Sequence, residues 1–519
     1  VVLTKKPLAG LITYGLFIFR SSFAFFTYSK GFDSLKSFVY ALANNLNADG
    51  SGREHIGSTM NESWGLWAQK VYVNQRHLAF AFGLFILVLL LLLPLFTETI
   101  EKLKNSIKRG DEQKKPENSF IHYVKSVLFT REAWLPQSYV PCILAGLLLG
   151  MMAFWNGAVV ITGISILFVM AALSRHKIEY LITAIITFLL STMQSRLFVG
   201  SGTGAVSIKY EPGFLAQTDK LGDILSFYIE LLGILPFILL GVFLVFIPTE
   251  KKWPRYAAAA LFILPLIFFM PSVGLAWSIV IIGACAAFFL YIAARKDFQV
   301  KTISPWLIPV FLGPIILAST LQLTPDITVN HKYIIFAMIL LNIPVSDLLT
   351  NLFENRSASA RVIAVSMVLM LTLTGIIDLM TLYNLDKNSV TYNQEDPVQV
   401  WVQDETDPHA IFLTHYMTHY NAPMSIFLAG RSVYNGYPYF TVTAGYNVDH
   451  RSEVMMKIYS SQDPQELRTL AISEGIHYIV IEEQNRSADE YTLSEEVFYN
   501  TFPVAFEDTG RNIVIFRVE

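Results

Sequence analysis

Residues 71–94, VYVNQRHLAFAFGLFILVLLLLLP, decide the class of this protein. From Leu78 to Phe96 the chain has nineteen consecutive residues without a charge, long enough for a helix to cross the hydrocarbon core of a bilayer. The whole chain shares this bias, because 53% of its 519 residues are hydrophobic and only 15% are charged. Ordinary soluble proteins carry about 25% charged residues. The composition therefore predicts a polytopic α-helical membrane protein.

Apolar runs along the chain predict about eleven transmembrane helices. The predicted spans are roughly residues 3–19, 78–97, 136–155, 157–174, 178–195, 224–247, 256–270, 273–294, 304–322, 333–352 and 362–381. The uncharged stretches 135–174 and 256–294 are each too long for one helix. Each is expected to form a helical hairpin, with turns near Asn156 and near Pro271–Ser272.

Lysine and arginine residues fall in alternate loops, which predicts an orientation for the chain. Loops rich in these residues should be cytoplasmic, and the clearest is the run KLKNSIKRGDEQKK at 102–115. The loops at 20–77, 196–223 and 323–332, together with everything after about residue 382, are then extracytoplasmic.

The C-terminal portion, residues 384–519, has a different character from the multi-spanning region at 1–383. It is polar and contains the short strand-like runs AIFLT, HYIVIEE and NIVIFRV. The helix-like segment DPQELRTLAISEGI lies between them, with Asp463 as a candidate N-cap and Gly475 as a stop. These patterns predict a small extracytoplasmic α/β domain.

The sequence offers no strong metal site. Cys142 and Cys285 fall inside apolar runs, where cysteine is usually a small buried hydrophobe. His415 and His419 have a spacing that binds metals on a helix, but no HExxH pattern supports this, and the stretch is expected to be a strand exit and loop. No metal ligand is predicted.

Polar residues gather at the outer ends of three predicted helices, which we call helix mouths. Arg20 ends the first span; Gln75, Arg76 and His77 precede the second; Asn330, His331 and Lys332 lead into the tenth. One cation at a helix end would usually snorkel to the interface. Three mouths with cations on the side that the positive-inside rule disfavours predict an anionic partner. That partner is Glu211, Glu230, Asp326 or a bound phosphate.

The aromatic stretch GRSVYNGYPYFTVTAGYN, residues 430–447, has glycine and proline interleaved. Two interpretations remain open for this loop, which contains Arg431 and Tyr437. It is either a packed corner of the domain or a platform for a sugar or lipid head group.

Six stretches occur in order along the chain: FRSSFAFFTYSKGF, ESWGLWAQKVYVNQRHLAF, YEPGFLAQ, PDITVNHKY, LAGRSVYNGYPYFTVTAGYN and HYIVIEE. In this order they resemble bacterial and archaeal membrane proteins of the GT-C glycosyltransferase superfamily, relatives of the protein-mannosyltransferase and aminoarabinose-transferase type. The resemblance covers essentially all of the chain. It implies an enzyme of the cell envelope that transfers a sugar from a polyprenyl-phosphate donor to a glycan or protein acceptor on the outer face of the plasma membrane.

The resemblance also implies roles for residues at the helix mouths. Cations there would hold the lipid phosphate, with Arg76 and Lys332 as the principal candidates. Gln75, His77, Asn330, His331 and Arg20 would lie beside them, and Glu211, Glu230, Arg431 and Tyr437 are further candidates for substrate contact. No cofactor is implied beyond the donor, and the requirement for a divalent metal is left open.

The chain departs from this group in one respect. Relatives carry an N-terminal block of spans with an acidic outer loop of the pattern GGHGDxxFH, which nothing in 1–519 matches. The catalytic base is therefore expected to precede Val1, and no catalytic residue is assigned. The alternatives are a transporter or flippase of a lipid-linked substrate and a non-catalytic envelope-assembly protein. No feature predicts a nucleic-acid partner.

Overall fold

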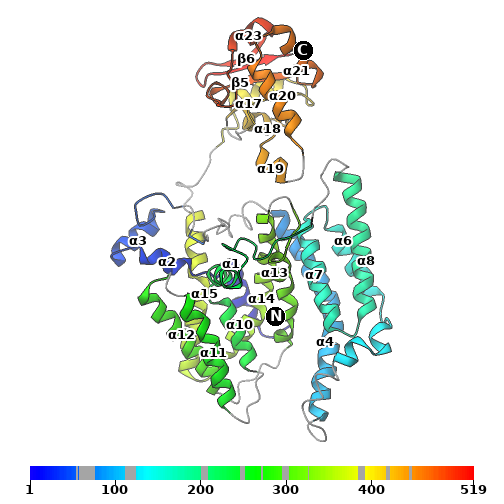
Figure 1. The fold of residues 1–519 in the computed structure, drawn as a ribbon, viewed down its shortest axis with the longest axis vertical. Helices are drawn as coiled ribbons and strands as arrows, with labels where there is room; N and C mark the ends of the chain where they lie inside the picture. The colour runs from blue at the N-terminus through cyan, green and yellow to red at the C-terminus, as the bar shows by residue number, and fades with distance from the viewer. Residues whose placement is uncertain are drawn as a thin grey trace. The chain divides into compact units, whose positions relative to one another are not determined.

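The computed structural model describes residues 1–53, 56–57, 76–110, 124–199, 208–245, 252–269, 273–294, 303–324, 327–383, 392–416, 421–443 and 447–518. The chain divides into two compact units, one formed by most of Val1–Ser389 and one formed mainly by Val390–Glu519 (Figure 1). The domain boundary predicted at 383/384 adjoins residues 384–391, which lie outside the described part, and it stays a prediction.

The first unit is almost entirely helical. Its α-helices are α1 (Pro7–Ile18), α2 (Ala24–Lys30), α3 (Leu35–Ala43), α4 (Arg76–Gly110), α6 (Val140–Met151), α7 (Gly157–Leu173), α8 (Lys177–Gln194), α9 (Leu221–Leu232), α10 (Leu235–Leu244), α11 (Trp253–Phe269), α12 (Leu275–Ala294), α13 (Ile308–Ala318), α14 (His331–Phe353) and α15 (Ala358–Tyr383). The short 3-10 helices η2 (Arg131–Trp134), η5 (Ser304–Leu307) and η6 (Ile327–Asn330) and the π-helix η3 (Ser195–Val199) extend or join them.

Five helical stretches in the described part are long and apolar enough to cross a membrane. They are His77–Lys102, Lys177–Leu197, Leu275–Ala294, Ile327–Phe353 and Ala358–Thr381, and the bent pair α9 and α10 would be a sixth. The other predicted spans also contain helices, but these are shorter. The structure thus shows a helical protein of membrane type, and the number of eleven crossings stays a prediction.

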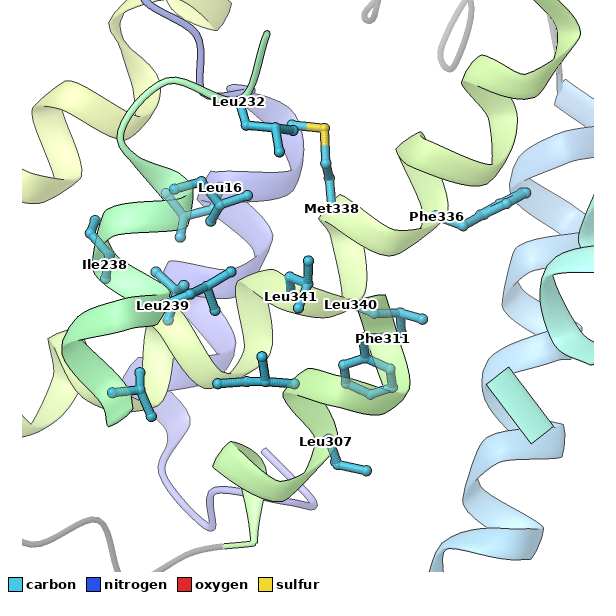
Figure 2. Packing of buried hydrophobic residues seen from close by; sticks show 14 of the residues in the cluster. Leu16, Leu232, Ile238, Leu239, Leu307, Phe311, Phe336, Met338, Leu340 and Leu341 are labelled. Atoms are coloured by element: carbon cyan, nitrogen blue, oxygen red, sulfur yellow. The ribbon is translucent and has the colours of Figure 1, made fainter. Parts of the chain in front are cut away.

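Helix α14 lies at the centre of this bundle. In its most apolar stretch 94% of the residues are buried, because α1, α7, α10, α13 and α15 all pack against it. Figure 2 shows side chains of α1, α10, α13 and α14, among them Leu16, Phe311 and Met338, filling the space between these helices. Inside a bilayer, such contacts stabilise mainly through close van der Waals packing, since the lipid is as apolar as the side chains.

Helices α6 and α8 pack closely through a small-residue motif. Gly146 and Gly150 form a G-x-x-x-G pair on α6, and a Cβ at either position would lie 2.8 Å from the Cβ of Ile186 or Leu190 on α8. Only glycine permits this separation, as is common between membrane helices.

The turn predicted near Asn156, between α6 and α7, is confirmed. The Asn156 side chain caps α7 by accepting from the amides of Ala158 and Val159.

The predicted span at 224–247 is wrong in one respect, because the chain bends there by 97° between α9 and α10. Gly233 has a positive φ of 60° at the bend, a conformation that glycine adopts readily. A Cβ on Gly233 would also lie within 3.0 Å of Ser21 and Ser22. Gly233 and Pro236, at N2 of α10, were the signals of this bend in the sequence.

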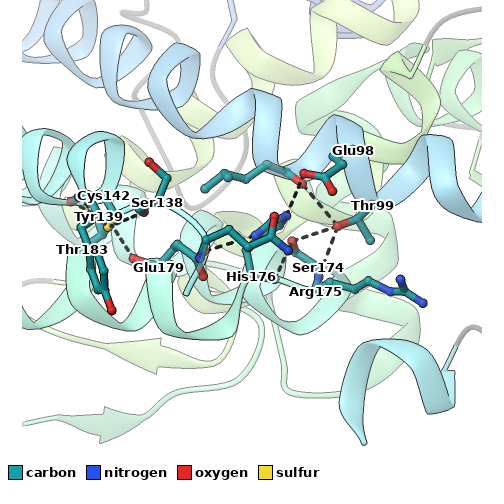
Figure 3. A network of polar contacts seen from close by, with 12 residues as sticks. Glu98, Thr99, Ser138, Tyr139, Cys142, Ser174, Arg175, His176, Glu179 and Thr183 are labelled. Carbon is teal, nitrogen blue, oxygen red and sulfur yellow. Dashed lines mark hydrogen bonds and ion pairs between the residues drawn. The ribbon is translucent and has the colours of Figure 1, made fainter. Parts of the chain in front are cut away.

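A buried polar network joins α4 to the turn between α7 and α8. The imidazole of His176 lies between two carboxylates, with Nε2 3.4 Å from Glu98 and Nδ1 3.3 Å from Glu179 (Figure 3). Glu179 is fully buried and also accepts from the amide of Gln137. The network therefore holds three separate segments together on the predicted cytoplasmic side.

The second unit is an α/β domain with a five-stranded sheet in the order β4-β3-β5-β7-β6. Its strands are β3 (Ile411–Leu413), β4 (Ser432–Val433), β5 (Tyr478–Ile481), β6 (Val504–Asp508) and β7 (Ile513–Arg517), and its helices are α17 (Pro397–Glu405), α18 (Ala422–Leu428), α19 (Pro438–Thr443), α20 (Asp449–Ser460), α21 (Pro464–Ser473), α22 (Glu483–Arg486) and α23 (Glu495–Thr501). The three predicted strands are confirmed, as are the Asp463 cap and the stop at Gly475.

Alternate residues of this sheet face two separate cores, as the two-residue period of a strand requires. Phe412, Tyr478 and Val480 pack against residues of α17 and α18. Leu413 and Ile479 face the opposite core, which residues of α20, α21 and α23 complete. Both faces of the sheet are therefore covered by helices.

Candidate functional site

Two of the predicted helix mouths lie together in the first unit. Lys332 is half-buried in the first turn of α14, and His77 is exposed in the first turn of α4. The charge of Lys332 acts on the His77 imidazole, so the two side chains are close enough to interact electrostatically. Arg76 is the first residue of α4, but its side chain and all of Gln75 lie outside the described part. The structure therefore brings together one residue from each of these mouths.

Asn330 and His331 position the start of α14. The Asn330 side-chain amide is buried and donates to the carbonyls of Ala318, at 3.1 Å, and Leu321, at 2.6 Å. The His331 Nδ1 donates to the Thr328 carbonyl. These bonds attach the end of α13 and the η6 turn to α14. They give both residues a local positioning role beside Lys332.

The loop that contains Glu211 is attached to the same mouth. Strand β1 (Lys209–Tyr210) pairs with β2 (Leu321–Gln322), and the Glu211 amide donates to the Thr320 carbonyl at 3.0 Å. The Glu211 side chain itself is exposed. Asp326, the other acidic candidate here, lies outside the described residues.

An apolar groove with a volume of about 540 Å³ is lined in part by α4 and α14. On α4 it starts at Ala79, two residues after His77, and continues to Leu93, which is about 21 Å along a helix. Its remaining walls come from Val1–Thr4, from α1 (Ala9, Gly10, Thr13, Tyr14, Phe17), and from Met170, Leu307, Phe311, Ile339, Leu340 and Ile343. Almost all of the lining is hydrocarbon, which suits a long apolar chain.

Arg20 lies in a different environment from the other predicted phosphate ligands. Only 2% of it is exposed, and its NH2 donates to the Gly57 carbonyl. Asp378 on α15 accepts from the Ile56 amide at 2.8 Å. A Cβ on Gly57 would lie 2.6 Å from Asp378 Oδ2 and 3.2 Å from Arg20 NH2. This geometry favours a structural role for Arg20 in anchoring residues 56–57.

Arg53 completes this buried cluster and was not among the residues predicted from the sequence. Its guanidinium donates to Thr381 Oγ1, Asn45 Oδ1 and the Tyr28 hydroxyl, and it lies 5.2 Å from the centre of the Tyr28 ring. Both arginines interact with the charge of Asp378. The sequence signal for this cluster was Asp378, a carboxylate near the end of an apolar span, because such a group needs a cationic partner.

The side chain of Glu230 is exposed on α9. Its main chain has a clearer role, because the bend after α9 leaves carbonyls without helical partners. The Glu230 carbonyl accepts from Ser22 Oγ at 3.4 Å, and the Leu232 carbonyl accepts from Ser21 Oγ at 2.8 Å. The first loop therefore caps this broken helix.

Arg431 and Tyr437 belong to the second unit. Arg431 donates to Thr406 Oγ1 and to the carbonyls of Gln403, Thr406 and Ala429, so its guanidinium caps the C-terminal end of α17. These bonds give Arg431 a structural role, and its predicted contact with substrate stays a prediction. Tyr437 is half-buried, and His419 lies outside the described residues.

Among the described residues, no group of three or more histidine, cysteine or acidic side chains has the arrangement of a metal site. In comparisons with known proteins, no family model matches the chain and no curated protein matches it.

Proposed function

We propose that this chain is a membrane glycosyltransferase of the GT-C type, which transfers a sugar from a polyprenyl-phosphate donor to an acceptor on the outer face of a plasma membrane. The observation that carries the proposal is the apolar groove whose α4 wall starts at Ala79, two residues after His77, together with the electrostatic interaction between His77 and Lys332. A polyprenyl-phosphate sugar has the matching chemistry, because its long hydrocarbon chain ends in an anion.

The residues of the site divide into two roles. The hydrocarbon walls contributed by α1, α4 and α14 take the polyprenyl chain. Lys332, with His77 and the predicted Arg76, binds the phosphate at the mouth. When the sugar leaves, negative charge builds up on that phosphate, and fixed cations stabilise it most strongly in the transition state. The acidic base that would activate the acceptor is not assigned to a residue of this chain.

A transporter of a lipid-linked substrate would also use such a groove. The bend between α9 and α10 is the observation that favours it, because broken helices expose carbonyls that bind coupling ions in transporters. Here the carbonyls of Glu230 and Leu232 already accept hydrogen bonds from Ser22 and Ser21. The bend therefore serves packing, and we place the transferase first.

The test is the release of radiolabelled sugar from a polyprenyl-phosphate sugar by the full-length protein in lipid nanodiscs. We expect Lys332→Ala to lower kcat/KM by about 100-fold or more, because one fixed donor to a developing anion is lost. Lys220→Ala removes an exposed lysine of the same predicted side and is the matched control. Equal turnover in Lys332→Ala and the control would overturn the site. Movement of intact donor between leaflets, without sugar release, would identify a transporter.

A further inference from the structure

The parallel strands β4, β3 and β5 of the second unit end at one edge of the sheet, and each is followed by a buried polar residue. Asn435 follows β4 and is 2% exposed, His415 follows β3 and is 6% exposed, and Glu482 follows β5 and is 1% exposed. Burial of three polar side chains at one edge requires partners for their polar atoms.

The strand order reverses at this edge. The chain leaves β3 through α18 to reach β4 on one side, and then passes through α20 and α21 to reach β5 on the other side of β3. In open α/β sheets, ligands bind in the crevice at the carboxyl ends of the strands where the order reverses. The position of the three residues is therefore the usual position of a ligand site.

Two of the buried oxygens at this edge have no hydrogen-bond partner among the residues that the structure describes. Glu482 Oε2 accepts from the Ala422 amide at 3.3 Å, but Oε1 accepts from no group in the described structure. Asn435 Nδ2 donates to Ser452 Oγ at 3.1 Å, but its Oδ1 likewise has no described partner. Both atoms are acceptors, so the ligand that would satisfy them must supply hydrogen-bond donors.

Tyrosine side chains that follow β3 and β4 contact further acids. His415 and Tyr416 stack with their ring centres 5.2 Å apart, and the Tyr416 hydroxyl donates to Glu490 at 3.4 Å. Beyond β4, the Tyr434 hydroxyl donates to Glu474 at 2.5 Å. The edge thus combines carboxylates with tyrosine rings, which suits a ligand that has both hydroxyl groups and an apolar face.

We propose that this edge of the second unit binds a neutral oligosaccharide, whose hydroxyl groups donate to Glu482 and Asn435. An anion is disfavoured because both unpartnered atoms are acceptors and an anion offers them no donor. A single small cation is disfavoured because the two acceptors follow β4 and β5, which lie on either side of β3 and are separated by roughly 10 Å. The proposal does not depend on the transferase activity of the first unit.

The experiment measures binding of maltotriose, mannotriose and triacetylchitotriose to the full-length protein by calorimetry. Lipid nanodiscs are required, because maltoside detergents would compete. We expect saturable binding of at least one probe, weakened tenfold or more by Glu482→Gln, which keeps the shape of the side chain, and by Asn435→Ala. Glu483→Gln alters the exposed neighbour on α22 and should leave the affinity unchanged. Thermal melting of each variant checks that it is folded.

Two results would overturn the proposal: no saturable binding of any of the three probes to the wild type, or equal affinities in Glu482→Gln and Glu483→Gln. Binding of calcium chloride alone, abolished by Glu482→Gln, would replace the sugar site with a cation site. Lys332→Ala should bind the oligosaccharide normally, and Glu482→Gln should still release sugar from the donor. Failure of the transferase and failure of the sugar site are therefore separate outcomes.

Discussion

Two buried carboxylates, one in each unit, have similar contacts and different surroundings. Asp378 in the helical unit is 5% exposed and accepts from the Ile56 amide, and Glu482 in the α/β unit is 1% exposed and accepts from the Ala422 amide. Asp378 has two buried arginines beside it, Arg20 and Arg53. The arginines near Glu482 are Arg486 and Arg511, and both form ion pairs with other acids.

The difference shows that the Asp378 carboxylate has a structural role, whereas the Glu482 carboxyl remains available to a ligand. At a membrane helix end a carboxylate needs compensating cations, because little water is there to solvate it. Asp378 therefore works as an anchor for the first loop. Among the described residues Glu482 forms no ion pair, and burial raises the pKa of its carboxyl to about 7, with Arg511 and Arg486 opposing the rise. A carboxyl of that kind can accept a ligand or a proton.

The largest effect is expected from Asp378→Ala. Removing the carboxylate leaves Arg20 and Arg53 buried without their common acid, and loss of one partner from a buried charge cluster costs about 3–5 kcal/mol of stability. Thermal denaturation of the full-length protein in nanodiscs should show a marked fall in Tm. Asp219→Ala, at an exposed site, is the control and should melt like the wild type.

Gly57→Ala should disrupt the contacts that anchor residues 56–57 and lower the Tm, without changing a charge. Its Cβ would lie 2.6 Å from Asp378 Oδ2, closer than the atoms can approach. A Tm that stays at the wild-type value in both Asp378→Ala and Gly57→Ala would show that this cluster does not anchor the loop.

The pH dependence of Glu482 is the next effect in size. Its folded pKa of about 7 lies above the ordinary value of 4.5, so the folded state retains a proton that the unfolded state has lost between these two values. The free energy of unfolding should therefore fall by about 3 kcal/mol as the pH rises from 4.5 to 7, and remain low above that. Glu482→Gln cannot ionise and should remove this fall.

Calorimetric melting of the full-length protein between pH 4.5 and 8 measures this difference. The stability of Glu482→Gln relative to wild type should increase with pH through the window and then level off. Glu483→Gln provides the baseline for an acid that is exposed on the same helix. Identical pH profiles for the wild type and Glu482→Gln would mean that Glu482 ionises in the folded protein as freely as in the unfolded chain.

The sequence was informative where the pattern is local. Apolar runs located the helices, and the caps at Asn156 and Asp463 follow from side chains that bond amides two or three residues away. The bend at Gly233 was missed because the apolar run continues through it, although a glycine and a proline flank the point. Hydropathy also could not distinguish the buried α14 from the mostly exposed α8, since both are apolar enough to span.

The candidate site was less accessible to sequence reasoning. The proximity of His77 to Lys332 could be proposed from their shared position at helix mouths. The role of Arg20 could not, because it depends on Gly57 and Asp378, which lie 37 and 358 positions away in the chain. Likewise, Asn435 and Glu482 share an edge only through the order of strands in the sheet, which no local pattern encodes.

The smallest effect is expected at an exposed ion pair, which serves as a reference for the two buried acids. Lys6 contacts Glu354 at 2.5 Å, but half of the Glu354 side chain is exposed and Lys6 also donates to Asn351. Exposed pairs contribute less than about 1 kcal/mol, because water and salt screen both charges. Glu354→Gln should therefore shift the Tm only slightly, and less still in high salt. A loss comparable to that of Asp378→Ala would show that burial does not decide which acids hold this fold.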